Sequence, residues 1–234
     1  MRRKARTSHP FALLAVGKCP TAGVTKTRLS PPLSPQEAAH LYECFLKDSI
    51  EQMRQVKGVQ PVLAYDPPSA YGYFAGLGAD FDLIPQEGAD LGARLDAALS
   101  EYLHAGYQAA AIMNTDSPTL PATYLQMAFR FLETDNDMVL GPCDDGGYYL
   151  IGLKQPAPRV LREVRMSTEN TAAETIAIAR EEGLRVRLLP EWYDVDDQQS
   201  LERLYSELTN VEGHIAPHTR AYAAAHSQLR RAFP

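Results

Sequence analysis

Cysteine is scarce in this sequence, and its spacing excludes the usual cysteine-based sites. The three cysteines, Cys19, Cys44 and Cys143, lie far apart and form neither a C-x-x-C pair nor a zinc-ligand spacing. This pattern is typical of reduced thiols in a cytoplasm. We therefore expect each cysteine to act as a small buried hydrophobic residue.

An excess of positive charge is also lacking, as is any long hydrophobic run. The chain has 23 Lys and Arg against 29 Asp and Glu, a formal net charge of −6, which argues against a nucleic-acid-binding surface. No segment approaches the ~20 consecutive apolar residues of a membrane span. The basic leader is followed by a short apolar run, residues 11–16, where a signal peptide needs roughly 7–15 apolar residues. We expect a cytoplasmic protein with no nucleic-acid partner and no membrane contact.

What is present is the composition of an ordinary globular chain, with 234 residues of which 45% are hydrophobic. Strand-like apolar runs alternate with helical periodicity, without a linker or an internal repeat, which implies a mostly parallel sheet covered on both faces. We predict a single three-layer α/β/α domain over residues 11–210. Residues 1–10 are expected to form a loose basic leader, and residues 211–234 a partly helical extension without assigned chemistry.

The local patterns predict the individual elements. Strands are expected at residues 11–16, 59–65, 81–85, 109–113, 137–141 and 184–189, and a further strand-like run is expected to follow the loop after residue 142, before residue 153. Helices are expected at residues 35–53, 70–77, 90–105, 121–133, 169–182 and 198–208, and residues 156–162 are expected to form a connection or a short helix. Ser34 and Glu37 form a capping box, and Ser167 or Thr168 is expected to cap the helix after residue 169. Asp48 is expected on the surface.

A cationic loop, residues 17–28, follows the first strand. It is not a Walker A motif, because two residues separate Gly23 from Lys26. Its small residues and its cations Lys18, Lys26 and Arg28 nevertheless favour an anion, since flexible backbone amides and positive side chains make a positive concavity. A solvated basic loop is the alternative.

Three strands end in acidic residues. The apolar run 109–113 stops at the sequence NTDSP, which contains Asp116, and two later strands lead to Asp144-Asp145 and Asp194-Asp196. Ligands of open α/β sheets bind at the carboxyl ends of the strands, where these carboxylates would meet. A simple turn before the proline is the alternative for Asp116.

Two further turns have both a structural and a functional interpretation. In residues 86–92, Asp90 caps the next helix, or the turn lines a nucleotide pocket with Arg94 directed at a phosphate or at Asp90. In the loop CDDGGYY, an Asp-Gly hairpin turn accounts for Asp145 and Gly146. It does not account for Asp144 and the aromatic pair, and paired glycines also let the backbone approach a ligand.

Converging carboxylates need a counter-charge. A divalent cation supplies it, because Mg²⁺ is typically held by one or two carboxylates together with substrate phosphates. Metal and cationic side chains would then stabilise the charge on a leaving pyrophosphate or nucleoside diphosphate.

Four motifs occur in order: KCPTAGVTKTRL from Lys18, NTDSP from Asn114, DGGYYLIG from Asp145 and WYDVD from Trp192. Over about residues 11–205 the chain resembles a bacterial family of glycosyltransferases that includes arsenosugar-biosynthesis-type enzymes. The resemblance implies a GT-A fold of the nucleotide-diphospho-sugar transferase type, related to 2-phospholactate and molybdenum-cofactor guanylyltransferases. The chain departs from the family pattern after Asp196, where it reads DQQSL, and at Met166, where an aromatic residue is usual.

The resemblance implies that Lys18, Lys26 and Arg28 bind nucleotide phosphates, that Asp116 and Asp196 bind Mg²⁺ or Mn²⁺, and that Asp145, Gly146 and Gly147 face the sugar or acceptor. With the residues from the turns, the candidate site comprises Asp116 and Asp145 for catalysis; Lys18, Gly23, Lys26, Arg28, Gly92 and Arg94 for nucleotide and phosphate; Asp144, Gly146, Gly147 and Tyr148 for substrate or acceptor; and Asp116 and Asp196 for the metal.

The leading hypothesis is a metal-dependent glycosyltransferase that uses a nucleotide-diphosphate sugar and a small-molecule acceptor. A nucleotidyltransferase that consumes a nucleoside triphosphate and releases pyrophosphate is the alternative. A non-catalytic nucleotide-binding module on the same fold is the third. The motifs are common to all three and do not separate them.

Overall fold

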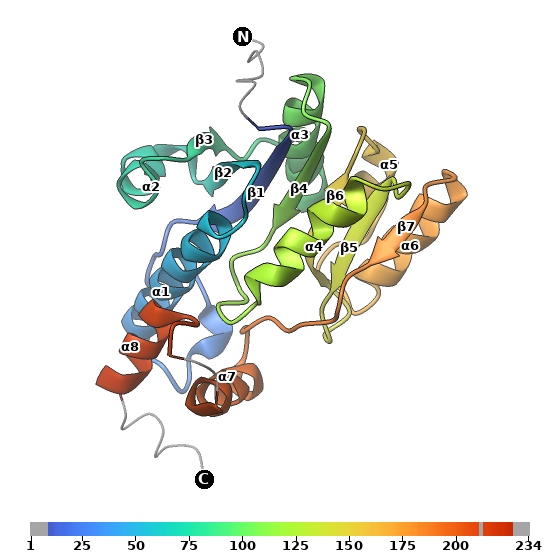
Figure 1. Cartoon of the computed structure of the whole chain (residues 1–234). Coiled ribbons are helices and arrows are strands. Elements are labelled where there is room, and N and C mark those ends of the chain that lie inside the picture. The colour runs from blue at the N-terminus through green and yellow to red at the C-terminus, as the bar shows by residue number, and fades with distance from the viewer. Residues whose placement is uncertain (1–8, 211–212, 227–234) are drawn as a thin grey trace.

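A seven-stranded sheet forms the centre of the molecule, with helices on both faces (Figure 1). The computed structural model describes residues 9–210 and 213–226. The strands are β1 (Phe11–Lys18), β2 (Val59–Asp66), β3 (Asp82–Pro85), β4 (Ala109–Met113), β5 (Met138–Pro142), β6 (Tyr148–Leu153) and β7 (Val186–Leu188). The helices are α1 (Pro35–Arg54), α2 (Tyr71–Leu77), α3 (Leu91–His104), α4 (Ala122–Leu132), α5 (Pro158–Arg162), α6 (Thr171–Glu181), α7 (Gln198–Asn210) and α8 (Pro217–Ala225), with short 3-10 turns η1 (Thr27–Leu29) and η2 (Pro68–Ala70). The predicted α/β class is confirmed.

The strand order is β3-β2-β1-β4-β6-β5-β7. All neighbours are parallel except β6, which pairs antiparallel with both β4 and β5. This exception follows from the tight turn at Asp145-Gly146, where Gly146 has a φ of 87° and β5 reverses directly into β6. The end of β5 and the start of β6 therefore lie at the same sheet edge as the carboxyl ends of β1 and β4.

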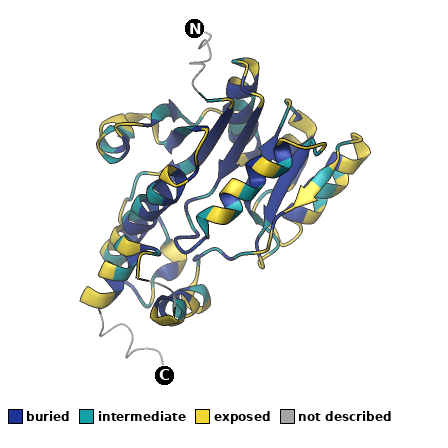
Figure 2. Ribbon diagram, viewed as in Figure 1, coloured by how far each residue is buried: buried dark blue, intermediate teal, exposed yellow. Residues whose placement is uncertain are grey.

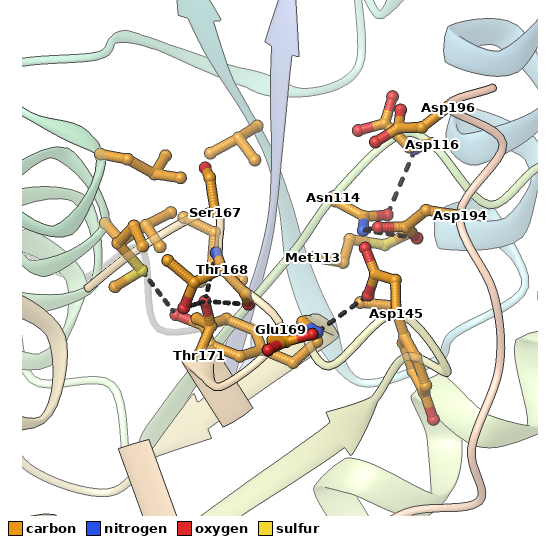
Figure 3. Close-up of a pocket in the computed structure, with 18 of the residues that line it drawn as sticks. Met113, Asn114, Asp116, Asp145, Ser167, Thr168, Glu169, Thr171, Asp194 and Asp196 are labelled. Atoms are coloured by element: carbon orange, nitrogen blue, oxygen red, sulfur yellow. Dashed lines mark hydrogen bonds between the residues drawn. The ribbon is translucent and has the colours of Figure 1, made fainter. Parts of the chain in front are cut away.

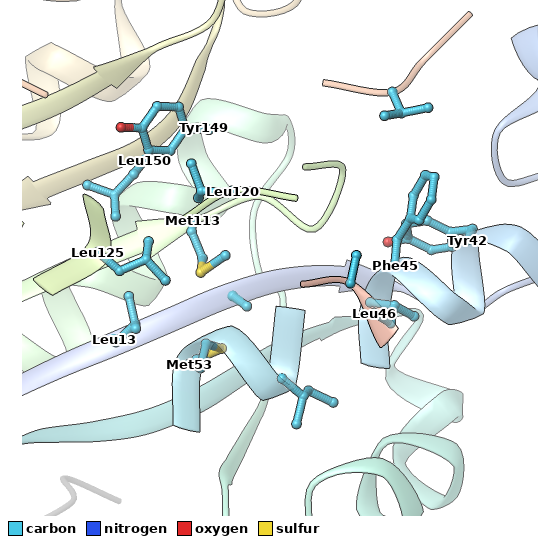
Figure 4. Close-up of a cluster of buried hydrophobic side chains, with 14 of the residues drawn as sticks. Leu13, Tyr42, Phe45, Leu46, Met53, Met113, Leu120, Leu125, Tyr149 and Leu150 are labelled. Carbon is cyan, nitrogen blue, oxygen red and sulfur yellow. The ribbon is translucent and has the colours of Figure 1, made fainter. Parts of the chain in front are cut away.

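The central strands β1, β4, β5 and β6 are buried on both faces, so adjacent residues of one strand pack into different cores, whereas the edge strand β7 is largely exposed (Figure 2). Leu13 of β1 packs with α1 and α4, in the cluster that Figure 4 shows around Phe45, Met53 and Leu125. The next residue, Leu14, packs on the other face with α3, α5 and α6. Helices therefore cover both faces of the central sheet, and the loops at its carboxyl edge remain accessible.

Asp48 corrects one expectation. It is not on the surface: its side chain is buried in α1, and its two carboxylate oxygens accept hydrogen bonds from the backbone amides of His218 and Thr219, each at 2.9 Å. It thereby caps the start of α8 and ties that helix to α1. Burial raises the pKa of the Asp48 carboxyl.

The predicted cap of α1 is present, whereas that of α6 is not. Ser34 and Glu37 form the reciprocal capping box at the start of α1. The predicted cap of α6 by Ser167 or Thr168 is wrong, because α6 begins after Asn170, which makes no side-chain cap.

Of the cysteines, Cys44 and Cys143 are buried as expected, whereas Cys19 is partly exposed. Among the described residues no helix is both long and apolar enough to cross a membrane.

Candidate active site

Two adjoining cavities lie at the carboxyl edge of the sheet. The loop cavity, about 400 Å³, lies beside the loop between β1 and η1 and is lined by Lys18, Lys26 and Arg28. The hairpin cavity, about 690 Å³, lies beside the β5–β6 turn and residues 166–169 (Figure 3). The residues that line both cavities include Arg28, Asn114, Asp116, Ser167 and Asp196. The predicted cationic loop and acidic strand ends therefore meet at one place.

Lys26 lies at the junction of the two cavities. It precedes η1 with a φ of 51°, and its side chain is only 6% exposed. Its Nζ forms an ion pair with Asp116 and donates hydrogen bonds to Asp196 Oδ1 at 2.7 Å and to the carbonyl of Val195 at 2.9 Å. Burial disfavours the charge, but the two carboxylates outweigh it and raise the pKa of Lys26. The ammonium is therefore directed at the predicted metal ligands, whereas the sequence predicted a phosphate contact.

Asp116 and Asp196 come from separate strand ends and converge on this one ammonium. Asp116 follows β4, and its carbonyl accepts a hydrogen bond from the amide of Val195, which joins the two loops. Asp196 Oδ2 also accepts a hydrogen bond from Arg28 Nη2 at 2.5 Å, within a salt bridge. Although burial opposes the charge, Lys26 and Arg28 lower the pKa of Asp196.

Asp194, one of the carboxylates expected at this edge, lines the hairpin cavity, although no catalytic, phosphate or metal role was predicted for it. Asn114 Nδ2 donates to both of its carboxylate oxygens at 2.9 Å, and Ser117 Oγ donates to one of them at 2.7 Å. Burial, reinforced by the charge of Asp116, raises the pKa of Asp194 to about 6. The spacing of Asp194 and Asp196 in WYDVD was the available signal, since residues two apart in an extended segment point to the same side, and both line the hairpin cavity.

The residues at the junction fit a hard divalent cation that is held partly by the substrate. No group of three or more His, Cys, Asp or Glu side chains is arranged for metal binding within residues 9–210 and 213–226. Asp116 and Asp196 are a two-carboxylate set, and the Lys26 ammonium marks the position where both reach one cation. Such a pair suits Mg²⁺ or Mn²⁺ when substrate phosphates and water complete the coordination and Lys26 moves away.

Three predicted nucleotide residues lie outside both cavities. Gly92 is buried where α3 meets α5, and a Cβ there would be 2.2 Å from the carbonyl oxygen of Leu161, so close packing accounts for this glycine. Arg94 turns toward Asp66, at 3.6 Å, and its Nε donates to the carbonyl of Gly88. Its backbone amide donates a hydrogen bond to the carbonyl of Asp90, but its guanidinium is not directed at the Asp90 side chain, and Arg94 lines neither of the two cavities.

Asp90 is instead the N-cap of α3, as the structural interpretation of that turn predicted, and accepts a hydrogen bond from the amide of Ala93 at 2.8 Å. Gly23, the third of these residues, has a φ of 75° at the exposed tip of the β1–η1 loop, with open space around it. Of the predicted nucleotide residues, Lys18, Lys26 and Arg28 line the loop cavity.

The predicted acceptor residues divide between the hairpin cavity and the surface. Asp145, Gly147 and Tyr148 line the cavity. Asp144 points away from the cavity and forms a salt bridge of 2.5 Å with Arg203, whose guanidinium stacks on the ring of Tyr193.

Gly146 also contributes no wall to that cavity. A Cβ on it would lie 1.8 Å from the carbonyl oxygen of Glu169, so the turn must pack against that segment. The same contact brings residues 166–169 to the cavity. The local sequence predicted only a helix cap within this segment. Ser167 has a φ of 61° there and lines both cavities, and in Figure 3 it lies across from Asp116 and Asp196.

The fold and the site define a class: a nucleotide-diphospho-sugar transferase-like α/β domain with its polar cluster at the carboxyl edge of the sheet. The chain belongs to the bacterial family described as "Uncharacterized protein conserved in bacteria (DUF2064)", whose model matches residues 49–168. Among curated proteins, none matches the chain.

Solved structures support the same class. A "putative nucleotide-diphospho-sugar transferase" from Desulfovibrio desulfuricans G20 is 30% identical, over 96% of this chain and 98% of its own, with a TM-score of 0.89. Two others share the fold. CMP:2-keto-3-deoxy-manno-octonic acid synthetase in complex with CTP is 13% identical over 86% of this chain and 98% of its own, with a TM-score of 0.52. Rv0371c of Mycobacterium tuberculosis H37Rv in complex with manganese is 16% identical over 85% of this chain and 98% of its own, with a TM-score of 0.52.

Proposed function

We propose that this protein is a metal-dependent glycosyltransferase that uses a nucleotide-diphosphate sugar as donor. The observation that carries the proposal is the division of charge between the two adjoining cavities. The loop cavity presents Lys18, Lys26 and Arg28, whereas the hairpin cavity continues past Asp116 with hydroxyl, aromatic and carboxylate side chains. A diphosphate requires such cations, and a sugar with its acceptor requires a second compartment beside them.

Each part of the cluster has a role in this proposal. Lys18 and Arg28 bind the diphosphate from the wall of the loop cavity. Lys26 balances the charge of Asp116 and Asp196 before the diphosphate arrives and lies close enough to the loop cavity to bind it afterwards. Asp145, on the wall of the hairpin cavity, is the candidate to accept the proton of the attacking acceptor group.

Asp116 and Asp196 are the residues that would hold Mg²⁺ or Mn²⁺. When bound, the metal supplies positive charge for the diphosphate that leaves. The manganese complex of the Mycobacterium tuberculosis protein of this fold supports the choice of ion. The three free cysteines favour the cytoplasm as the compartment. The proposal keeps the resemblance to arsenosugar-biosynthesis-type enzymes, which does not specify the acceptor.

Nucleotidyl transfer is the second candidate. It is supported by the structural likeness to the synthetase in complex with CTP. The same cations and carboxylates would bind a nucleoside triphosphate, and the charge would then develop on pyrophosphate. The third candidate, a non-catalytic nucleotide-binding module, requires the loop cavity alone.

One set of incubations separates the three. The protein is incubated with Mn²⁺ or Mg²⁺ and candidate acceptors, with nucleotide-diphosphate sugars in one series and nucleoside triphosphates in the other. Metal-dependent release of nucleoside diphosphate supports the proposal, and release of pyrophosphate supports the second candidate. Tight nucleotide binding that is independent of metal and unchanged in Asp116→Ala, without any turnover, would leave only the binding module.

A further inference from the structure

The two cavities differ in charge as well as in position. The loop cavity is lined by three cations and two carboxylates, whereas the hairpin cavity is lined by one cation and five carboxylates. The five are Asp116, Asp145, Glu169, Asp194 and Asp196, and the cation is Arg28. Asp116, Asp196 and Arg28 lie at the shared junction, so Asp145, Asp194 and Glu169 determine the charge of the hairpin cavity beyond it.

Asp145 and Glu169 have no cationic partner within the described part of the chain. Asp145 accepts one hydrogen bond, from the amide of Gly147 at 2.8 Å. The two residues belong to the same wall, because the turn at Gly146 packs against the backbone of Glu169 and accepts a hydrogen bond from Ala172.

The arginines near this wall are paired with other carboxylates. Arg165 binds Glu174 at 2.5 Å, and Arg162 binds Asp96 at 2.5 Å. Arg28 binds Asp196 at the junction. None of these three guanidinium groups is thus directed to neutralise an anion deep in the hairpin cavity.

We propose that the acceptor bound in the hairpin cavity is an uncharged or positively charged hydroxyl or amine compound, and that Asp145 and Glu169 exclude phosphorylated and carboxylated acceptors. This inference rests on the proposed function, which assigns the acceptor to this cavity. Like charges disfavour the wrong ligand, which is a common source of specificity. Ser167 and Tyr148 also line this cavity; the Tyr148 hydroxyl donates to Met166 Sδ at 3.7 Å, and the Ser167 hydroxyl suits a polyhydroxy compound.

The test uses three matched hexoses with the full chain at about pH 6.5, where an amino group is protonated. The probes are D-glucosamine, N-acetyl-D-glucosamine and D-glucuronate, and dissociation constants are measured by ligand-observed NMR titration. We expect the wild-type protein to bind glucosamine most tightly and glucuronate most weakly.

A double variant makes the measurement specific to this cavity. In Asp145→Asn/Glu169→Gln we expect glucosamine to weaken and glucuronate to tighten, each by about threefold to tenfold, since partly exposed charges are screened by solvent. N-acetylglucosamine should change by less than twofold. The control, Asp135→Asn/Glu181→Gln, removes the same charge from exposed positions that line neither cavity and should leave all three affinities unchanged.

Three results would overturn the inference: glucuronate binding the wild-type protein as tightly as glucosamine, affinities that do not respond to the double variant, or no binding of any probe. Binding of UDP and GDP with Mn²⁺ is measured in parallel. Failure of nucleotide binding with the charge selectivity intact would defeat the proposed transferase alone, and nucleotide binding without that selectivity would defeat this inference alone.

Discussion

Lys26 donates a hydrogen bond of 2.7 Å to a carboxylate oxygen of Asp196, although 170 residues separate the two in the chain. The same ammonium is paired with Asp116. The Lys26 ammonium holds the two predicted metal ligands close together. It therefore arranges them for a metal ion, but it also competes with that ion for their charge.

Asp116→Asn should abolish metal-dependent nucleotide binding without unfolding the protein. The amide keeps the shape of the side chain but loses the charge that a hard cation requires. Calorimetric titration of UDP and GDP, with and without Mn²⁺, measures the effect, and Asp135→Asn at an exposed position is the matched control. Metal-dependent affinity that survives in Asp116→Asn would count against the assignment.

Lys26→Met should lower the free energy of unfolding by about 2 to 3 kcal/mol, less than the 3–5 kcal/mol typical of fully buried pairs, because the two carboxylates are about one-third exposed. Mn²⁺ should then raise the melting temperature of the variant more than that of the wild type, since the metal no longer competes with the ammonium. Thermal unfolding with and without Mn²⁺ is the measurement. An equal shift in both proteins would contradict the competition.

Asp194 should make the wild-type protein less stable as the pH rises from about 4 to 6. Its pKa in the folded state is about 6, raised by burial and by Asp116, against about 3.9 in an unfolded chain. The folded state therefore holds a proton that the unfolded state releases, and the stability present below pH 4 is lost through this window, by at most about 3 kcal/mol.

The comparison of Asp194→Asn with the wild type by urea unfolding isolates this contribution. Asp196→Asn provides a control of opposite sign. Since Lys26 and Arg28 lower the pKa of Asp196 against the effect of burial, its contribution is present above the unfolded pKa and is lost as the pH falls. Parallel pH profiles for the two variants would refute both assignments.

Gly92→Ala should destabilise the fold by about 2 to 3 kcal/mol, because the new methyl group would overlap the backbone of Leu161. The folded protein should keep its nucleotide affinity, since Gly92 lies outside both cavities. Gly76→Ala in α2 adds the same methyl group in open space and should be neutral or stabilising by up to about 1 kcal/mol. A tenfold weaker nucleotide affinity in folded Gly92→Ala would show instead that Gly92 contributes to nucleotide binding.

By itself the sequence determined the order of strands and helices and which loops meet. Apolar periodicity and capping residues act over a few positions, as at Ser34 and Glu37, and a mostly parallel sheet brings successive strand ends to one edge. For this reason the cationic loop, Asp116 and Asp196 could be assigned to one crevice before any coordinates were known.

Only the tertiary structure decided the direction of individual side chains within that crevice. Asp144 and Asp145 are adjacent and chemically alike, yet one binds Arg203 on the surface and the other lines a cavity. Asp48 is buried because α8, 170 residues later, needs its carboxylate as a cap. Such outcomes depend on long-range packing and on the pairing of charges from distant segments, and no local pattern along the chain carries that information.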